Sequence, residues 1–229
     1  DHPGLHRYSD TRGLPEFVDA IVEKARARNG LACERESVLV GAGATALLAC
    51  VAGAVVAPGD EVLILAPFWP LIRGIVQAVG GRPVEVPFYD RVDSLAKALA
   101  AVRERTSSRT VALYVSSPSN PSGRVLPPDW LEALAGFARS QDLWLISDEV
   151  YEDFVYRGES VSPGRFAPER SLSVYSFSKA YGMAGNRVGY AVGPRELIDE
   201  ARKLGTHSYY CAPVAGQIAA LAALREGGA

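Results

Sequence analysis

Residues 175–190 read YSFSKAYGMAGNRVGY, and three kinds of enzyme chemistry could use the lysine in this stretch. Tyr175 stands four residues before Lys179, which is the Y-x-x-x-K spacing of hydride-transfer enzymes. Ser176 stands three residues before it, which is the S-x-x-K spacing of acyl-serine enzymes. Arg187 follows eight residues later, and a planar guanidinium suits phosphate oxygens. The elements on either side of the stretch distinguish these partners.

The bulk composition is that of a protein that handles small molecules. The chain has 229 residues, 48% of them apolar, so it can bury one sizeable core. Its formal net charge is -2 and it contains no block of like charges. A nucleic-acid surface and a disordered tail are therefore not expected.

Neither metal, disulfide nor membrane signals stand out. His2 and His6 have an i, i+4 spacing, but no further ligand cluster follows, so we expect no metal site. The N-terminus lacks a signal-peptide pattern, and the apolar run 44–56 is shorter than the roughly 20 residues of a membrane span, so it predicts a buried helix. An odd number of widely spaced cysteines predicts reduced thiols in a cytoplasmic protein. These cysteines are Cys33, Cys50 and Cys211.

Helical and strand patterns alternate along most of the chain. Helices are predicted over 15–28, 43–57, 68–79, 94–103 and 128–140, and from residues 195 and 214 onward. Strands are predicted over 38–40, 61–65, 83–86, 110–115, 143–146, 172–175 and 188–192. Strands separated by helices imply crossover connections and a mainly parallel sheet covered on both faces. The expected fold is an α/β three-layer sandwich.

Polar residues follow four of the predicted strands directly. Ligands bind at the carboxyl ends of strands in such sheets, so these residues should share one crevice. A helix N-terminus with small residues, the Ser176 hydroxyl and Arg187 suit a phosphate, and Lys179 is placed to form a Schiff base with a carbonyl. The four clusters are Gly43 with Ala44 and Thr45, then Asn120, then Asp148, then residues 176–179.

These residues carry a family resemblance. The run SFSKAYGMAGNRVG at 176–189 looks like the cofactor-lysine signature of class I/II aminotransferases, the pyridoxal phosphate enzymes of fold type I. The sequence NPSG at 120–123 resembles the family's N-P-[ST]-G loop, and DEVY at 148–151 resembles its D-x-x-Y. The resemblance runs from about Tyr8 to about Leu224. It implies that residues 1–229 form the pyridoxal phosphate-binding large domain, with N- and C-terminal parts of the family fold, including the small domain, missing.

The resemblance also implies roles for residues. Lys179 would be the internal aldimine lysine and then the proton shuttle at the substrate's α-carbon. Asp148 would pair with the pyridine nitrogen and keep it protonated, so that the ring accepts electrons. Asn120 and Tyr151 would hydrogen-bond the phenolic oxygen of pyridoxal 5'-phosphate. Ser176, Arg187, Ala44 and Thr45, with Gly43 before them, would hold its phosphate.

Two aromatic residues have implied roles as well. Trp69, in PFWP, would stack on the cofactor ring, and Tyr8 would reach the phosphate of the neighbouring subunit in a homodimer. Taken alone, both favour ordinary packing, and the Asn120 loop is equally compatible with a plain turn. Burial of Lys179 beside Arg187 is expected to lower the lysine's pKa. Asp148 is expected to stay ionised opposite a pyridinium.

The implied function is transfer of an amino group from an amino acid to a 2-oxoacid. The same cofactor supports elimination, cyclisation or oxidation, and the motifs do not choose between them or name the amino acid. A ligand-sensing domain without turnover is a further alternative. A short-chain dehydrogenase is a remote one, because LSVYSFS reads as a strand running into a loop and no ribose-binding acid ends the second strand.

The resemblance implies that the arginine that holds the substrate's α-carboxylate lies in the missing C-terminal part. If 229 residues were the whole protein, we would expect cofactor binding with weak or absent transamination, because the substrate would lack its anchor. Assay of this chain with common amino acids and 2-oxoacids tests this, and full activity would contradict it.

Overall fold

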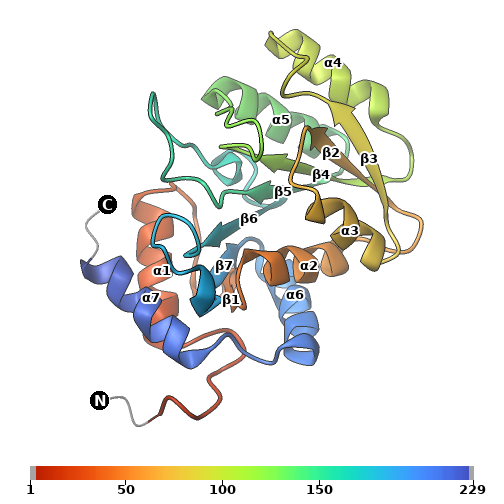
Figure 1. The fold of residues 1–229 in the computed structure, drawn as a ribbon. Helices are drawn as coiled ribbons and strands as arrows, with labels where there is room; N and C mark the ends of the chain where they lie inside the picture. The colour runs from red at the N-terminus through yellow and green to blue at the C-terminus, as the bar shows by residue number, and fades with distance from the viewer. Residues whose placement is uncertain (1–3, 227–229) are drawn as a thin grey trace.

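Seven strands form one sheet in the order β1-β7-β6-β5-β4-β2-β3 in the computed structural model, which describes residues 4–226 (Figure 1). β7 is antiparallel to both β1 and β6, and the other neighbouring strands are parallel. The carboxyl ends of all described strands except β7 therefore meet at one edge. The strands are β1 Val38–Gly41, β2 Glu61–Ala66, β3 Arg82–Pro87, β4 Thr110–Ser116, β5 Trp144–Asp148, β6 Ser171–Ser176 and β7 Gly189–Val192.

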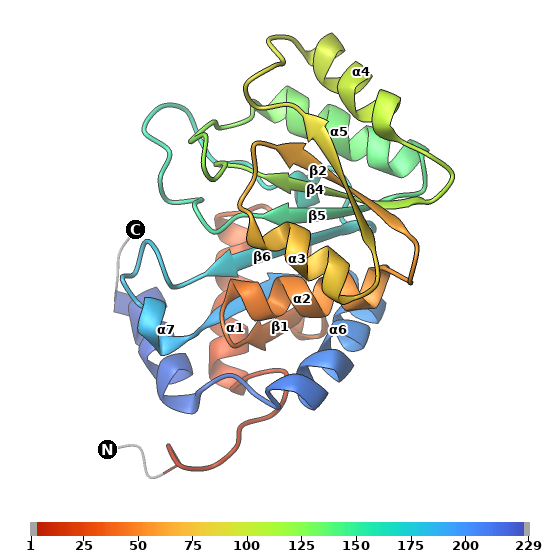
Figure 2. The same cartoon turned by 45° about the vertical axis from the view of Figure 1, so that its right-hand side comes forward.

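Helices cover both faces of the sheet, as the two views show (Figures 1 and 2). α2, α3 and α6 pack on one face, and α1, α4, α5 and α7 pack on the other. The predicted three-layer α/β architecture is confirmed. The helices are α1 Pro15–Ala27, α2 Ala44–Val55, α3 Leu71–Ala78, α4 Leu95–Arg105, α5 Pro128–Ser140, α6 Arg195–Ser208 and α7 Val214–Glu226, with short 3-10 turns η1 Arg35–Ser37, η2 Pro163–Arg165 and η3 Ala184–Asn186.

The strand pleat sorts the core between the two faces. On β5, Leu145 joins the cluster under α4 and α5, whereas Ile146 joins the cluster under α2 and α6. On β6, Val174 faces α2 and Tyr175 faces α1. Buried parallel strands are apolar on both faces for this reason. The apolar run 44–56 is the buried helix α2, as predicted.

All the predicted helices and strands form, but some begin or end at other residues than predicted. α3 begins at Leu71 and not at residue 68, because Pro67 and Pro70 disfavour a continuous helix and leave Trp69 in the loop after β2. α2 begins at Ala44 because Gly43, with φ of +85°, is its N-cap. As a result, Gly43 and Trp69 lie on loops at the carboxyl edge of the sheet.

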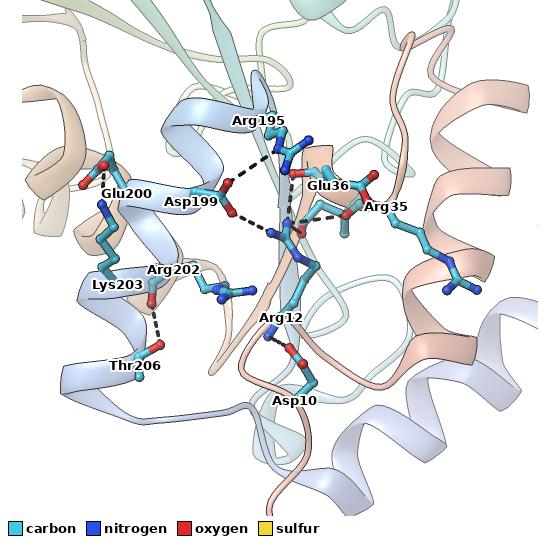
Figure 3. Close-up of polar contacts among 11 residues, drawn as sticks. Asp10, Arg12, Arg35, Glu36, Arg195, Asp199, Glu200, Arg202, Lys203 and Thr206 are labelled. Atoms are coloured by element: carbon cyan, nitrogen blue, oxygen red, sulfur yellow. Dashed lines mark hydrogen bonds and ion pairs between the residues drawn. The ribbon is translucent and has the colours of Figure 1, made fainter.

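Arg12 fixes the N-terminal segment to the rest of the fold (Figure 3). Its guanidinium donates to the backbone carbonyls of Glu36 at 2.9 Å and Val38 at 3.0 Å, and to the Asp199 carboxylate of α6 at 2.6 Å. Its backbone N–H donates to the Asp10 carboxylate at 2.7 Å. The segment that leads back to Tyr8 is thereby held against β1 and α6.

Residues 4–226 contain no cluster of three or more His, Cys, Asp or Glu arranged for a metal ion. His2, half of the histidine pair considered above, lies outside them. No helix in the same part of the chain has the length and apolarity to cross a membrane. The cysteines are free thiols: Cys33, Cys50 and Cys211.

A buried acidic residue follows Asp148. Glu149 is 1% exposed, and its carboxyl accepts hydrogen bonds from Ser162 at 2.7 Å and Tyr175 at 2.9 Å. Burial, aided by the nearby charge of Glu152, raises the pKa of Glu149 to about 7, although these hydrogen bonds oppose the shift. A carboxyl in such a place is favoured in its protonated form.

The Glu149 site predicts a pH dependence of stability. The folded chain keeps this proton up to about pH 7, whereas the unfolded chain releases it near its ordinary pKa of 4.5. The folded state therefore holds more protons within that window, and stability falls as pH rises through it, by at most about 1.4 kcal/mol per pH unit. Urea unfolding of Glu149→Gln should give a shallower slope between pH 5 and 7 than wild type. Parallel slopes would contradict the assignment.

Gly189 lies where three segments approach closely, and a side chain there should be destabilising. A Cβ at this position would lie 2.6 Å from the Tyr175 carbonyl oxygen and 2.9 Å from the Ala44 backbone nitrogen. We expect Gly189→Ala to lower the unfolding free energy by about 1–3 kcal/mol, as overpacking does. Gly136→Ala is the control, because an exposed helical glycine with open space around it should gain about 0.5–1 kcal/mol. Equal effects in urea unfolding would contradict the prediction.

Candidate active site

A cavity of about 210 Å³ opens at the carboxyl edge of the sheet. It gathers nine of the eleven predicted site residues, all except Gly43 and Tyr8. They arrive from loops after five strands, which is the location expected of a ligand site in an α/β sheet. The lining residues are Ala44, Thr45, Leu48, Trp69, Asn120, Asp148, Val150, Tyr151, Ser176, Ser178, Lys179, Ala184 and Arg187.

One end of the cavity gathers groups that favour an anion. The N-terminus of α2 has no side-chain cap, so its first N–H groups and the positive end of its dipole are available. The Arg187 guanidinium lies beside it and donates to the carbonyls of Ala184 at 2.9 Å and Ala42 at 3.3 Å. A Cβ at Gly43 would lie 2.4 Å from this guanidinium, so glycine is required for the contact.

Backbone conformation aims Arg187 at this end. Its φ is +53°, in the left-handed region that L residues rarely adopt and that recurs at ligand sites. Ser176 ends β6, where it pairs with Gly189, and Gly189 also pairs with Gly41 at the end of β1. The Ser176 Oγ accepts the Ser178 N–H at 3.0 Å, which leaves its hydrogen free to donate. Helix, hydroxyl and guanidinium thus converge on one point.

The other end of the cavity holds a buried carboxylate. Asp148 is 7% exposed and accepts hydrogen bonds from the Tyr114 hydroxyl at 2.6 Å and the Val150 N–H at 3.3 Å. Burial raises the pKa of Asp148, and these two donors oppose the shift. No cation pairs with it among the described residues. A ligand carrying a positive group could therefore form an ion pair with the Asp148 carboxylate.

Lys179, Tyr151 and Trp69 also line the cavity. The Lys179 Nζ lies 5.7 Å from the centre of the Tyr151 ring. Trp69 lies half-buried on the cavity wall, and Asn120 presents an amide from the loop after β4. The expectation that Lys179 is buried beside Arg187 is wrong for this chain, because both side chains are exposed on the loop between β6 and β7.

Tyr8 lies away from the cavity. Its side chain is 81% exposed, and its ring packs edge-on against Tyr210 with centroids 4.8 Å apart. It therefore does not contribute to the cavity of its own chain. Tyr175 is not free to act with Lys179 either, because it is buried and its hydroxyl donates to Glu149. This geometry excludes the Y-x-x-x-K arrangement of a short-chain dehydrogenase.

Several residues of the site were not predicted. Ser178 lies within the predicted cluster 176–179 but had no predicted role. Ala184 lies within the motif around Lys179, and its place in that motif is the signal that could have indicated it. Leu48 and Val150 contribute apolar wall, which sequence patterns assign to the core. Tyr114 sits in the middle of a buried strand and carries no signal beyond its hydroxyl.

The donor set fits pyridoxal 5'-phosphate, the cofactor that the motifs imply. The α2 N-terminus, Ser176 and Arg187 match its phosphate, and the unpaired Asp148 carboxylate matches a protonated ring nitrogen. The amide of Asn120 and the hydroxyl of Tyr151 could each hydrogen-bond its phenolic oxygen.

Comparisons with known proteins agree with this fit. The family described as aminotransferase class I and II matches residues 1–228. The chain is 40% identical over 221 residues to the aspartate/prephenate aminotransferase of Thermus thermophilus, covering 96% of this chain and 57% of the relative. It is 37% identical to an arginine–pyruvate transaminase of Pseudomonas aeruginosa, covering 96% of this chain and 56% of that protein.

Solved structures give the same result. The aspartate aminotransferase of Thermus thermophilus with maleate superposes with a TM-score of 0.93 at 39% identity, covering 98% of this chain and 58% of that one. N-succinyldiaminopimelate aminotransferase of Mycobacterium tuberculosis gives a TM-score of 0.93 at 32% identity, covering 98% and 60%.

The chain spans 57% of the length of its Thermus thermophilus relative. Within that span, the family match, the sequence identity and the fold all agree with the site geometry. The chain belongs to the class I and II aminotransferase family, whose members are pyridoxal phosphate-dependent transferases.

Proposed function

We propose that this chain is the cofactor-binding part of an aminotransferase that moves an amino group from an amino acid to a 2-oxoacid. The observation that carries the proposal is the pairing, in one cavity, of an anion site at Arg187 with a buried, cation-free carboxylate at Asp148. A phosphate and a cationic ring nitrogen would satisfy both ends at once. Lys179 lies on the loop beside that cavity.

Pyridoxal phosphate, when bound, supplies an aldehyde that condenses with an amine and a ring that accepts electrons from the substrate's α-carbon. The Lys179 amine would hold the aldehyde covalently until substrate replaces it. The freed Nζ would then take the proton from the α-carbon and return it during transfer. Asp148 would keep the ring nitrogen protonated, and Trp69 would stack on the ring.

The remaining side chains would orient the cofactor. Asn120 and Tyr151 would hydrogen-bond its phenolic oxygen, and Ser176 and Arg187 would hold its phosphate at the α2 N-terminus with Ala44, Thr45 and Gly43. These are roles for groups that already line or border the cavity.

A homodimer is part of this proposal. Tyr8 is exposed on a segment that Arg12 and Gln217 hold in place, the latter through hydrogen bonds to Leu14 and Ser9. An exposed aromatic on an anchored segment suits delivery of its hydroxyl to a second copy of the chain.

Free thiols, including the buried Cys33 and Cys50, suit a cytoplasmic location.

Covalent trapping tests the role of Lys179. Pyridoxal phosphate is added, the adduct is reduced with borohydride, and the labelled peptide is identified by mass spectrometry. We expect label at Lys179 in wild type, none at position 179 in Lys179→Ala, and wild-type labelling in Lys97→Ala, which changes an exposed lysine of α4. Undiminished labelling of Lys179→Ala at another lysine would contradict the assignment.

A second experiment distinguishes an enzyme from a ligand-sensing domain, because only an enzyme would turn over an amino acid.

A further inference from the structure

Tyr114 makes a buried hydrogen bond to the cavity carboxylate. It lies on β4, and Asp148 ends the neighbouring parallel strand β5, with Tyr114 paired to Ile146 and Ser116 paired to Asp148. The Tyr114 side chain is 1% exposed, and its hydroxyl lies 2.6 Å from an Asp148 carboxylate oxygen. Two adjacent strands therefore fix both partners, and neither depends on a flexible loop.

The hydroxyl is the strongest donor to Asp148 among the described residues. The other donor, the Val150 N–H, is at 3.3 Å and serves the second carboxylate oxygen. Burial raises the pKa of Asp148, whereas the Tyr114 hydrogen bond lowers it. Burial also raises the pKa of Tyr114 well above its ordinary value, so the phenol keeps its proton and can donate it to the Asp148 carboxylate.

Other charged or titratable groups near Asp148 serve different partners or stand further off. Tyr89, which follows β3, gives its hydroxyl to the Ser116 carbonyl at 2.6 Å. Lys179 and Arg187 line the same cavity, and neither forms an ion pair with Asp148. Tyr151 lies in the loop after Asp148 and also faces the cavity. Tyr114 is thus the side chain that directly holds the carboxylate.

We propose that Tyr114 is a positioning residue, whose hydroxyl holds Asp148 in the orientation and the ionised state that the cofactor's ring nitrogen requires. This inference rests on the proposed function. A donor bound to one carboxylate oxygen limits rotation of the group and favours its charged form before any ligand arrives. The second oxygen is left with only a weak backbone contact and is available to the ring nitrogen.

The test compares Tyr114→Phe with Tyr175→Phe. The Tyr114 ring packs among apolar residues such as Ile64 and Ile146, and phenylalanine preserves that packing while removing the hydroxyl. Tyr175 is a matched control, since it is equally buried and donates its hydroxyl to Glu149, the next carboxyl in the chain. Thermal unfolding verifies that both variants fold.

The first measurement needs no cofactor. Carboxyl ¹³C NMR follows the titration of Asp148, whose signal is identified by its loss in Asp148→Asn. We expect Tyr114→Phe to raise the midpoint of Asp148 by about one pH unit, a tenfold change in proton affinity. Tyr175→Phe should leave Asp148 unchanged and shift Glu149. Equal Asp148 midpoints in wild type and Tyr114→Phe would overturn the proposal.

The second measurement is the affinity for pyridoxal phosphate as a function of pH, read from cofactor absorbance. Tyr114→Phe should weaken binding by up to about tenfold at pH values below its raised Asp148 midpoint, and the loss should shrink as pH increases. A pH-independent loss would overturn the charge role. Wild type that binds no cofactor, despite a shifted Asp148 titration in the variant, would refute the proposed function and leave the Tyr114–Asp148 coupling established.

Discussion

The close approach of three backbone segments at Gly189 is the constraint on which the anion end of the cavity depends. Gly189 pairs with Gly41 of β1 on one side and with Ser176 of β6 on the other. Because β7 is antiparallel to both, it brings the carboxyl ends of β1 and β6 to the same edge, one strand apart. The N-terminus of α2, Ser176 and Arg187 then surround one point. Any side chain at 189 would push these segments apart.

Charge is distributed along the cavity as a consequence of that arrangement. Helix dipole and guanidinium make the Arg187 end positive, and the buried Asp148 carboxylate makes the far end negative. Each end lacks a partner of opposite charge in the described chain. Burying an unpaired carboxylate is unfavourable, so the fold must stabilise it through donors such as Tyr114 until a ligand arrives. A ligand with an anionic and a cationic end would pair with Arg187 and Asp148 together.

The sequence predicts the fold well because periodicity and turn chemistry are local signals. α5 begins and ends at the predicted residues, and the cavity gathers the residues that follow predicted strands. Strand direction is not local, so the antiparallel pairing of β7 was not specified. The left-handed backbone at Arg187 and the exposure of Lys179 depend on tertiary packing and on which surfaces are covered. Tyr114 cannot be predicted as a site residue, because a tyrosine in an apolar strand resembles ordinary core.

The loop after β5 shows how neighbouring acids are kept for different tasks. Asp148 faces the cavity, whereas Glu149 turns the other way toward Ser162 and Tyr175. Glu152, further along the same loop, forms an ion pair with Lys24 of α1, with 2.5 Å between the Lys24 Nζ and the Glu152 Oε1. Two adjacent ionised carboxylates on one side of the loop would repel each other and raise each other's pKa. Pointing them to opposite sides gives each carboxyl its own donors, Tyr114 for Asp148 and Ser162 with Tyr175 for Glu149. The contacts behind the loop therefore serve the cavity in front of it, because they fix the backbone from which Asp148 projects.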